Sequence, residues 1–176
     1  AVTVSNLLDG STYTSTTTAK TGALVVNFKS GQAATTTIDL QKGSTDAVTV
    51  TNVKDLTLTV GAASAFDGVT LDAAATKLTV NVTGAMTVGT NNHITASGTQ
   101  NLETIVVTGD KAITLGNVLD VTKLTDFSLA STGGAVTVGT LDASAATADI
   151  AVTQITASSS THGAVIGNID VTGLNT

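Results

Sequence analysis

The chain has no cysteine, no tryptophan and no arginine, and aromatic residues make up only 2% of its 176 residues. Without cysteine it has no disulfide, no thiol nucleophile and no thiolate metal site. Its apolar residues are valine, alanine, leucine and isoleucine. These small and β-branched side chains suit thin, regular, stacked interiors better than one thick core filled by aromatic rings.

Charged residues are also scarce, at 11%, and the net charge is -6. An acidic surface without arginine is a poor partner for nucleic acid or for an anionic membrane surface. Thr, Asp or Gly interrupts every apolar run, so membrane insertion is not expected. No signal peptide stands at Ala1, and the chain begins and ends inside its own repeat pattern. We therefore expect a fragment of a longer protein, with any targeting signal elsewhere.

Apolar and polar residues alternate with a period of two through most of the chain, which predicts β-strands. One motif, Ala-x-Thr-x-Gly, begins at Ala85, Ala112 and Ala135, and a shorter copy begins at Ala164. Successive copies are roughly 22 to 28 residues apart, which is the spacing of solenoid repeats.

This repeat predicts an all-β fold, a right-handed parallel β-helix with about three short strands in each turn, or rung. Residues 36–176 are expected to form the helix in rungs of roughly 22 to 28 residues, after an irregular or capping segment at residues 1–35. A tandem of antiparallel β-sandwiches is the alternative. It is less favoured because a sandwich does not require the same residue types at the same position of every repeat. Two inward columns are predicted: Met86, Ile113 and Val136 in one, and Val88, Leu115 and Val138 in the other.

No set of residues points to catalysis. His93 and His162 are the only histidines, and both stand in turn-like segments about three repeats apart. The sequence has no nucleophile elbow, paired glutamates, metalloprotease motif or phosphate loop. We therefore expect solvated turn histidines and no enzymatic activity.

Aspartate follows the apolar residue of the third expected strand in several rungs. Stacked about 4.8 Å apart, such carboxylates would repel one another, and calcium, which takes oxygen ligands, could bridge them. Turn-forming aspartates that accept hydrogen bonds from backbone amides are the favoured interpretation. Calcium is the one cofactor that the sequence suggests, and the candidate residues for its site are Asp72, Asp120, Asp142 and Asp170.

Threonine often occupies alternate positions, as at Thr57 and Thr59. Regular outward threonines are what an ice-binding face needs, but any exposed β-face favours them too. The pairs do not recur rung after rung in one column of the expected helix, so ice binding is not favoured.

Two strings carry a resemblance to a known family: NLETIVVTGDKAITLGNVLDVTKLTDFSLAST, from Asn101, and GGAVTVGTLDASAATADIAV, from Gly133. They resemble the repetitive body of bacterial S-layer proteins of the type I-secreted kind, which are related to repeats-in-toxin proteins. Similar strings occur in large bacterial adhesins. The resemblance covers roughly residues 38–176, but the calcium-binding nonapeptide of the repeats-in-toxin family is absent.

The resemblance implies a secreted structural protein of the bacterial cell surface. Its expected partners are further copies of itself, in a calcium-assisted S-layer array, and outer-membrane glycans that anchor the array through other regions. The expected function is a segment that builds the surface lattice. The alternative is the stalk or passenger region of a secreted adhesin, and a lattice seen by electron microscopy would separate the two.

Overall fold

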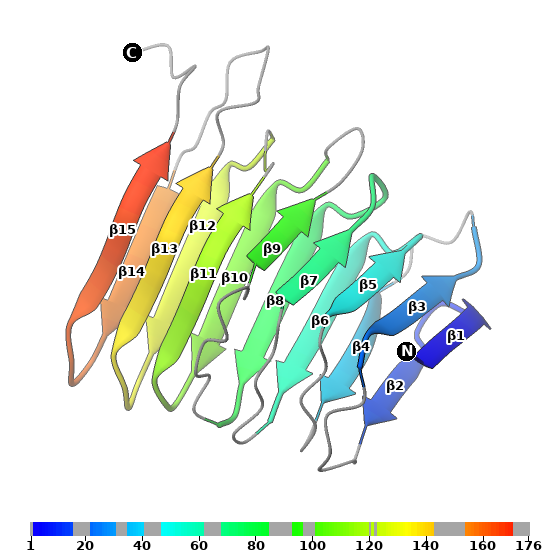
Figure 1. The fold of residues 1–176 in the computed structure, drawn as a ribbon, viewed down its shortest axis with the longest axis horizontal. Helices are drawn as coiled ribbons and strands as arrows, with labels where there is room; N and C mark the ends of the chain where they lie inside the picture. The colour runs from blue at the N-terminus through cyan, green and yellow to red at the C-terminus, as the bar shows by residue number, and fades with distance from the viewer. Residues whose placement is uncertain are drawn as a thin grey trace.

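The computed structural model describes residues 2–15, 22–30, 35–40, 47–61, 68–84, 93–96, 101–119, 121, 123–142 and 154–170. Within this part, every regular element is a β-strand. Two layers of strands lie face to face, and successive rungs stack from the N-terminal end to the C-terminal end (Figure 1). All pairing within each layer is parallel. The expected all-β parallel solenoid is confirmed, whereas its right-handedness stays a prediction.

The strands alternate between the two sheets along the chain. Sheet A has eight strands, in the order β1 (Val2–Leu7), β3 (Leu24–Phe28), β5 (Val48–Thr51), β7 (Gly68–Leu71), β9 (His93–Ala96), β11 (Ile113–Leu119), β13 (Val136–Asp142) and β15 (Ala164–Asp170). Sheet B has seven, in the order β14 (Gln154–Ser159), β12 (Asp126–Ser131), β10 (Thr104–Gly109), β8 (Lys77–Val82), β6 (Asp55–Val60), β4 (Thr35–Leu40) and β2 (Thr12–Ser15).

Each rung therefore contributes two described strands rather than the three expected from the sequence. All but the first residue of the Ala-x-Thr-x-Gly motif and the Leu-Asp segment after it belong to one long strand in β13, and β11 is the equivalent strand one rung earlier. Leu115 and Val118 are both buried, and the two residues between them, Gly116 and Asn117, are not. This break in the alternation makes one strand look like two in the sequence.

A close approach between backbones accompanies this break. In β13, a Cβ atom on Gly139 would overlap the carbonyl oxygen of Gly116 in the neighbouring strand. Glycine at this place in successive rungs therefore lets the long strands pack against one another.

One apolar column runs through all eight strands of sheet A. Its members pair directly from rung to rung: Val2, Leu24, Val48, Val69, Ile94, Val118, Leu141 and Ile169. The five members from Leu24 to Val118 are at most 3% exposed. A continuous column of this kind is expected where each rung buries the apolar side chains of its neighbours.

Sheet B carries an equivalent column facing the same core. The column consists of Tyr13, Ile38, Leu58, Val80, Val107, Leu129 and Ala157. The expected pairings of Ile113 with Val136 and of Leu115 with Val138 are confirmed in sheet A. Met86 and Val88, expected in the same two columns, lie outside the described residues.

The N-terminal region shares this architecture. Strands β1, β2 and β3 all lie in the first 35 residues, which were expected to be irregular or capping, and they join the same two sheets. The register of β1 against β3 shifts between Val4 and Leu7, where Asn6 has a positive φ of 60°. The solenoid therefore already includes residue 2, and its first strand is irregular.

Candidate functional surfaces

Tight turns line one edge of the solenoid. Thr132–Ala135 join β12 to β13, and Ser160–Gly163 join β14 to β15. Successive turns lie so close that a Cβ atom on Gly134 would overlap the backbone nitrogen of Ala112 in the preceding turn. This edge is a stacked row of backbone with little room for larger side chains.

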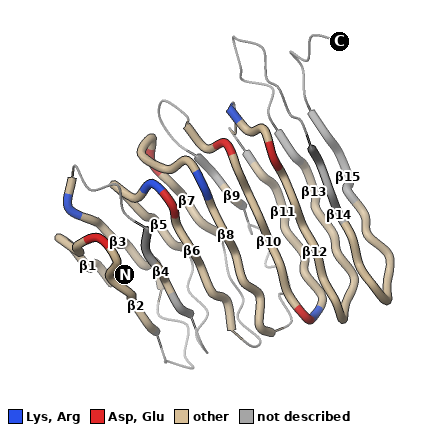
Figure 2. Tube along the Cα trace, turned by 180° about the vertical axis from the view of Figure 1, so that it is seen from behind, with Lys and Arg blue, Asp and Glu red and all other residues tan. Residues whose placement is uncertain are grey.

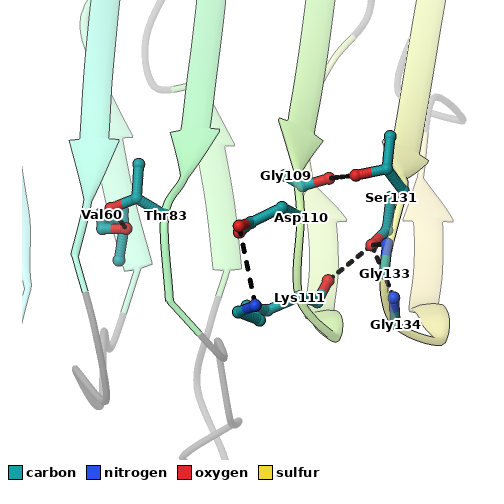
Figure 3. Close-up of polar contacts among 9 residues, drawn as sticks. Val60, Thr83, Gly109, Asp110, Lys111, Ser131, Gly133 and Gly134 are labelled. Carbon is teal, nitrogen blue, oxygen red and sulfur yellow. Dashed lines mark hydrogen bonds and ion pairs between the residues drawn. The ribbon is translucent and has the colours of Figure 1, made fainter.

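A serine fixes each of these two turns. Ser131, only 3% exposed, donates from Oγ to the carbonyl oxygen of Lys111 at 2.6 Å and accepts hydrogen bonds from the N–H groups of Gly133 and Gly134 (Figure 3). One hydroxyl thus closes its own turn and ties it to the preceding rung.

Ser159 repeats the arrangement one rung later. Its Oγ donates to the carbonyl oxygen of Gly134 at 2.8 Å and accepts from the N–H groups of Thr161 and His162. Neither serine was predicted from the sequence as a structural residue. The available signal was a serine at the end of two similar segments, FSLAS and ITASS, whose final serines pair in the structure.

Two threonines at the same edge of the solenoid also form hydrogen bonds between rungs. The N–H of Thr83 donates to the carbonyl oxygen of Val60, and that of Thr132 to the carbonyl oxygen of Gly109, both at 2.9 Å. The hydroxyl of Thr83 reaches the same Val60 oxygen at 3.3 Å (Figure 3). The polar groups at this edge are therefore used to hold rung to rung.

Of the candidate aspartates that the structure describes, two share one register position and the third, Asp72, does not. Asp142 and Asp170 are direct register partners in β13 and β15. Asp72 directly follows the last residue of β7, Leu71, which pairs with Ala96. The member of the apolar column of sheet A in this strand is Val69, two residues before Leu71. Asp72 is three residues after the column member Val69, whereas Asp142 and Asp170 each directly follow a column member, so Asp72 lies two positions further along the chain in its rung. Asp120 lies outside the described residues.

Asp72 has the turn-forming role that the sequence favoured. Its Oδ1 accepts from the N–H of Ala74 within its own turn, at 3.1 Å, and its Oδ2 accepts from the N–H of Asn52 in the preceding rung, at 2.9 Å. Asn52 has a positive φ of 62°, a conformation that asparagine tolerates better than most residues. The Asp72 carboxylate thus stabilises two adjacent turns.

The histidines are far apart in the chain and differ in setting. His93 is the first residue of β9 rather than a turn residue, whereas exposed His162 lies in the β14–β15 turn, with Nδ1 2.7 Å from the hydroxyl oxygen of Thr161. Among the described residues, no three His, Asp or Glu side chains gather as a metal-binding group.

The outer side of sheet B carries two columns of small polar residues, here called the hydroxyl face. The first contains Thr12, Thr37, Thr57, Thr79, Val106, Ser128 and Thr156, and the second Thr14, Asp39, Thr59, Asn81, Thr108, Ala130 and Ser158. The threonine pairs Thr12/Thr14 and Thr57/Thr59 lie in the same two columns but, as expected from the sequence, they do not recur rung after rung, because the rung between them carries Thr37 and Asp39. Four members of the two columns carry no hydroxyl: Asp39, Asn81, Val106 and Ala130.

Charged side chains lie mostly at the ends of the strands. Figure 2 shows the coloured residues concentrated near the two edges, with long uncharged stretches between them. Lys54, Lys77 and Glu103, for example, stand at or just before the start of sheet B strands. Polar groups on the hydroxyl face bond one another instead, as where the hydroxyl of Thr108 donates to Oδ1 of Asn81 at 3.3 Å.

Comparisons with protein-family models, with curated proteins and with solved structures find no significant match to this chain. In the part that the structure describes, no helix has the length and apolar character needed to cross a membrane.

Proposed function

We propose that this chain is a structural segment of a bacterial S-layer, secreted to the cell surface, where it helps to build the surface lattice. The alternative is the stalk or passenger region of a secreted adhesin. In both proposals the solenoid is a rigid spacer with a structural role, and neither proposal assigns a catalytic activity to it.

The unbroken apolar column from Val2 to Ile169 is the observation that carries this proposal. Rungs that contact only their neighbours form a quasi-one-dimensional rod, and each added rung lengthens it by about 4.8 Å. In a lattice-building protein, such a rod sets a fixed distance between the contacts at its ends and along its faces.

The surface chemistry supports the same proposal. A hydroxyl face with few charges can lie against another neutral surface without desolvating ions, which is costly. The cross-rung bonds of Ser131, Ser159 and Asp72 use side chains for internal cohesion. These features suit a module that has to keep its shape in an extracellular layer.

We also propose that calcium binds to this chain at one pair of aspartates. Asp142 and Asp170 stand in adjacent rungs at the same register position. Two aspartates at the same register position of neighbouring parallel strands repel one another when both are ionised, and a divalent cation bound by the pair would lower that repulsion. Asp72 is the internal comparison, because its two oxygens already accept backbone hydrogen bonds.

Electron microscopy of cells that produce the protein tests the proposal. A short epitope inserted after Gly163, in the exposed β14–β15 turn, marks the chain with gold-labelled antibody. The S-layer proposal predicts label spread over the whole envelope in register with a periodic layer. Label on sparse projecting fibres would favour the adhesin, and label confined to the cell interior would contradict both.

A further inference from the structure

A third column of residues borders the hydroxyl face at the starts of the sheet B strands. In β8, β10 and β12, each member of this column is followed by a buried residue and therefore faces outward. By direct register pairing, this strand-start column consists of Thr35, Asp55, Lys77, Thr104, Asp126 and Gln154. The hydroxyl face thus has charges of both signs along one side.

Lys77 and Asp126 lie in the strand-start column on opposite sides of β10. Because β8 and β12 are the two neighbours of β10 in sheet B, the backbones at Lys77 and Asp126 are about 10 Å apart. Thr104 of β10 stands between them as the register partner of both. Within one copy, the two charges therefore do not face each other directly.

Val106 occupies the next outward position of β10, midway between β8 and β12. It is the only large apolar residue in the two columns of the hydroxyl face, and its side chain is half-buried. Its register partners are Thr79 and Ser128. A small apolar centre with hydroxyl groups around it resembles the apolar core and polar rim of a protein–protein contact.

These positions are complementary to themselves under a two-fold rotation. An axis that runs parallel to the strands and passes over β10 places β8 of one copy opposite β12 of a second copy. Lys77 then lies opposite Asp126 of the second copy, and the same rotation places Asp126 opposite Lys77 of the second copy. Val106 lies opposite its own equivalent, and Thr79 lies opposite Ser128.

We propose that two copies of this chain associate face to face through the outer side of sheet B, about this two-fold axis. Both copies use the same surface, so the contact is closed and produces a pair of copies. Val106 lies at its centre, and two Lys77–Asp126 ion pairs lie along one side. This inference does not rest on the proposed S-layer function, in which the pair would be one lateral contact.

The size of the face indicates a weak and reversible contact. Five described strands, from β6 to β14, overlap in this arrangement. Five strands of six residues cover about 24 Å by 20 Å, or about 500 Å² on each copy. The total of about 1,000 Å² is typical of transient complexes. In a contact of this kind, charge complementarity contributes mainly to the choice of partner and of orientation.

Charge reversal at the two ionic positions tests the arrangement. For the wild-type chain, sedimentation equilibrium at increasing concentration should give a mass that rises from 17.3 kDa towards twice that value. Lys77→Asp and Asp126→Lys should each weaken association at least tenfold, because each variant places like charges opposite one another twice. An equimolar mixture of the two variants should associate again, because every reversed residue then faces an opposite charge.

Thr137→Asp, on the outer side of sheet A, is the matched control and should leave association unchanged. All variants should keep the wild-type circular dichroism spectrum. Val106→Glu, which places two carboxylates at the two-fold axis, is the second variant if a charge reversal fails to fold. It should also weaken association at least tenfold.

A wild-type chain that stays monomeric at every concentration would overturn the proposal. So would a mass that rises past two copies, single charge reversals that associate like the wild type, or a mixture that associates no better than either variant alone. Any of these results would leave the S-layer proposal standing, since microscopy of cells tests that separately.

Discussion

Ser131 and Ser159 occupy the same position in successive rungs of sheet B, and the hydroxyl of each donates to a backbone carbonyl of the rung before it. The same two hydroxyls accept N–H groups from the turns that follow them. A side chain that bonds both its own turn and the neighbouring turn couples local structure to stacking. The tight-turn edge is therefore stabilised by repetition of one polar contact.

Replacing Ser131 by alanine should lower the free energy of unfolding by about 1–3 kcal/mol, because the Lys111 carbonyl and two glycine N–H groups lose a partner at a site that is 3% exposed. Urea unfolding followed by circular dichroism measures the change. Ser128→Ala, on the outer side of the same strand, is the matched control and should change stability by less than about 0.5 kcal/mol. Equal effects of the two variants would contradict the role given to Ser131.

Two glycines in equivalent turns should respond differently to alanine. A Cβ atom on Gly134 would overlap the backbone of Ala112, whereas a Cβ atom on Gly163 meets nothing within 4 Å. Gly134→Ala should therefore cost on the order of 1–3 kcal/mol, as overpacking does. Gly163→Ala should leave the melting temperature almost unchanged. If both variants melt like the wild type, the turns are not stacked as closely as the structure shows.

Val138→Asp tests the column that Val138 shares with Leu115. Val138 is fully buried, so an aspartate there would place an unpaired charge in the core and cost at least about 3 kcal/mol. Thr137→Asp, one residue earlier on the outer side, should cost little. Thermal melts of the two variants give the comparison, and similar stabilities would contradict the inward placement of Val138.

Calcium should raise the melting temperature more than sodium at matched ionic strength. A ligand that binds only the folded state stabilises it by about 2.7 kcal/mol at one hundred times its dissociation constant. Asp142→Asn should reduce the calcium response, and Asp72→Asn should lower stability equally with and without calcium, because Asp72 bonds backbone amides. Identical shifts from the two salts would rule out calcium binding at the Asp142–Asp170 pair.

The sequence was sufficient to predict the parallel solenoid and the pairing of Ile113 with Val136, because stacking places like residues at like phases. It was insufficient to count strands per rung, since Gly116 and Asn117 break the alternation inside β11 without ending the strand. Strand periodicity also leaves a shift of two residues undetermined, because such a shift keeps every side chain on the same face. That ambiguity misplaced Asp72.

The hydroxyl face could not be predicted from the sequence for a different reason. Register partners are not evenly spaced in the sequence: Ile38 pairs with Leu58, 20 residues on, and Leu129 with Ala157, 28 residues on. Loops of unequal length absorb the difference, so threonines that share a column have no common spacing in the chain. Only the pairing of the strands brings Thr12 and Thr57 into line.

Each column and each surface depends on the parallel stacking of rungs, and distances between spin labels measure that stacking directly. The chain has no cysteine, so two introduced cysteines carry the only labels. Thr37 and Ser128 are four pairings apart in the first column of the hydroxyl face, and Thr12 and Ser128 are five. Double electron–electron resonance should give mean backbone separations of about 19 Å and 24 Å, one rung apart. Distances that do not increase with the number of rungs, as in a tandem of antiparallel sandwiches, would contradict the solenoid.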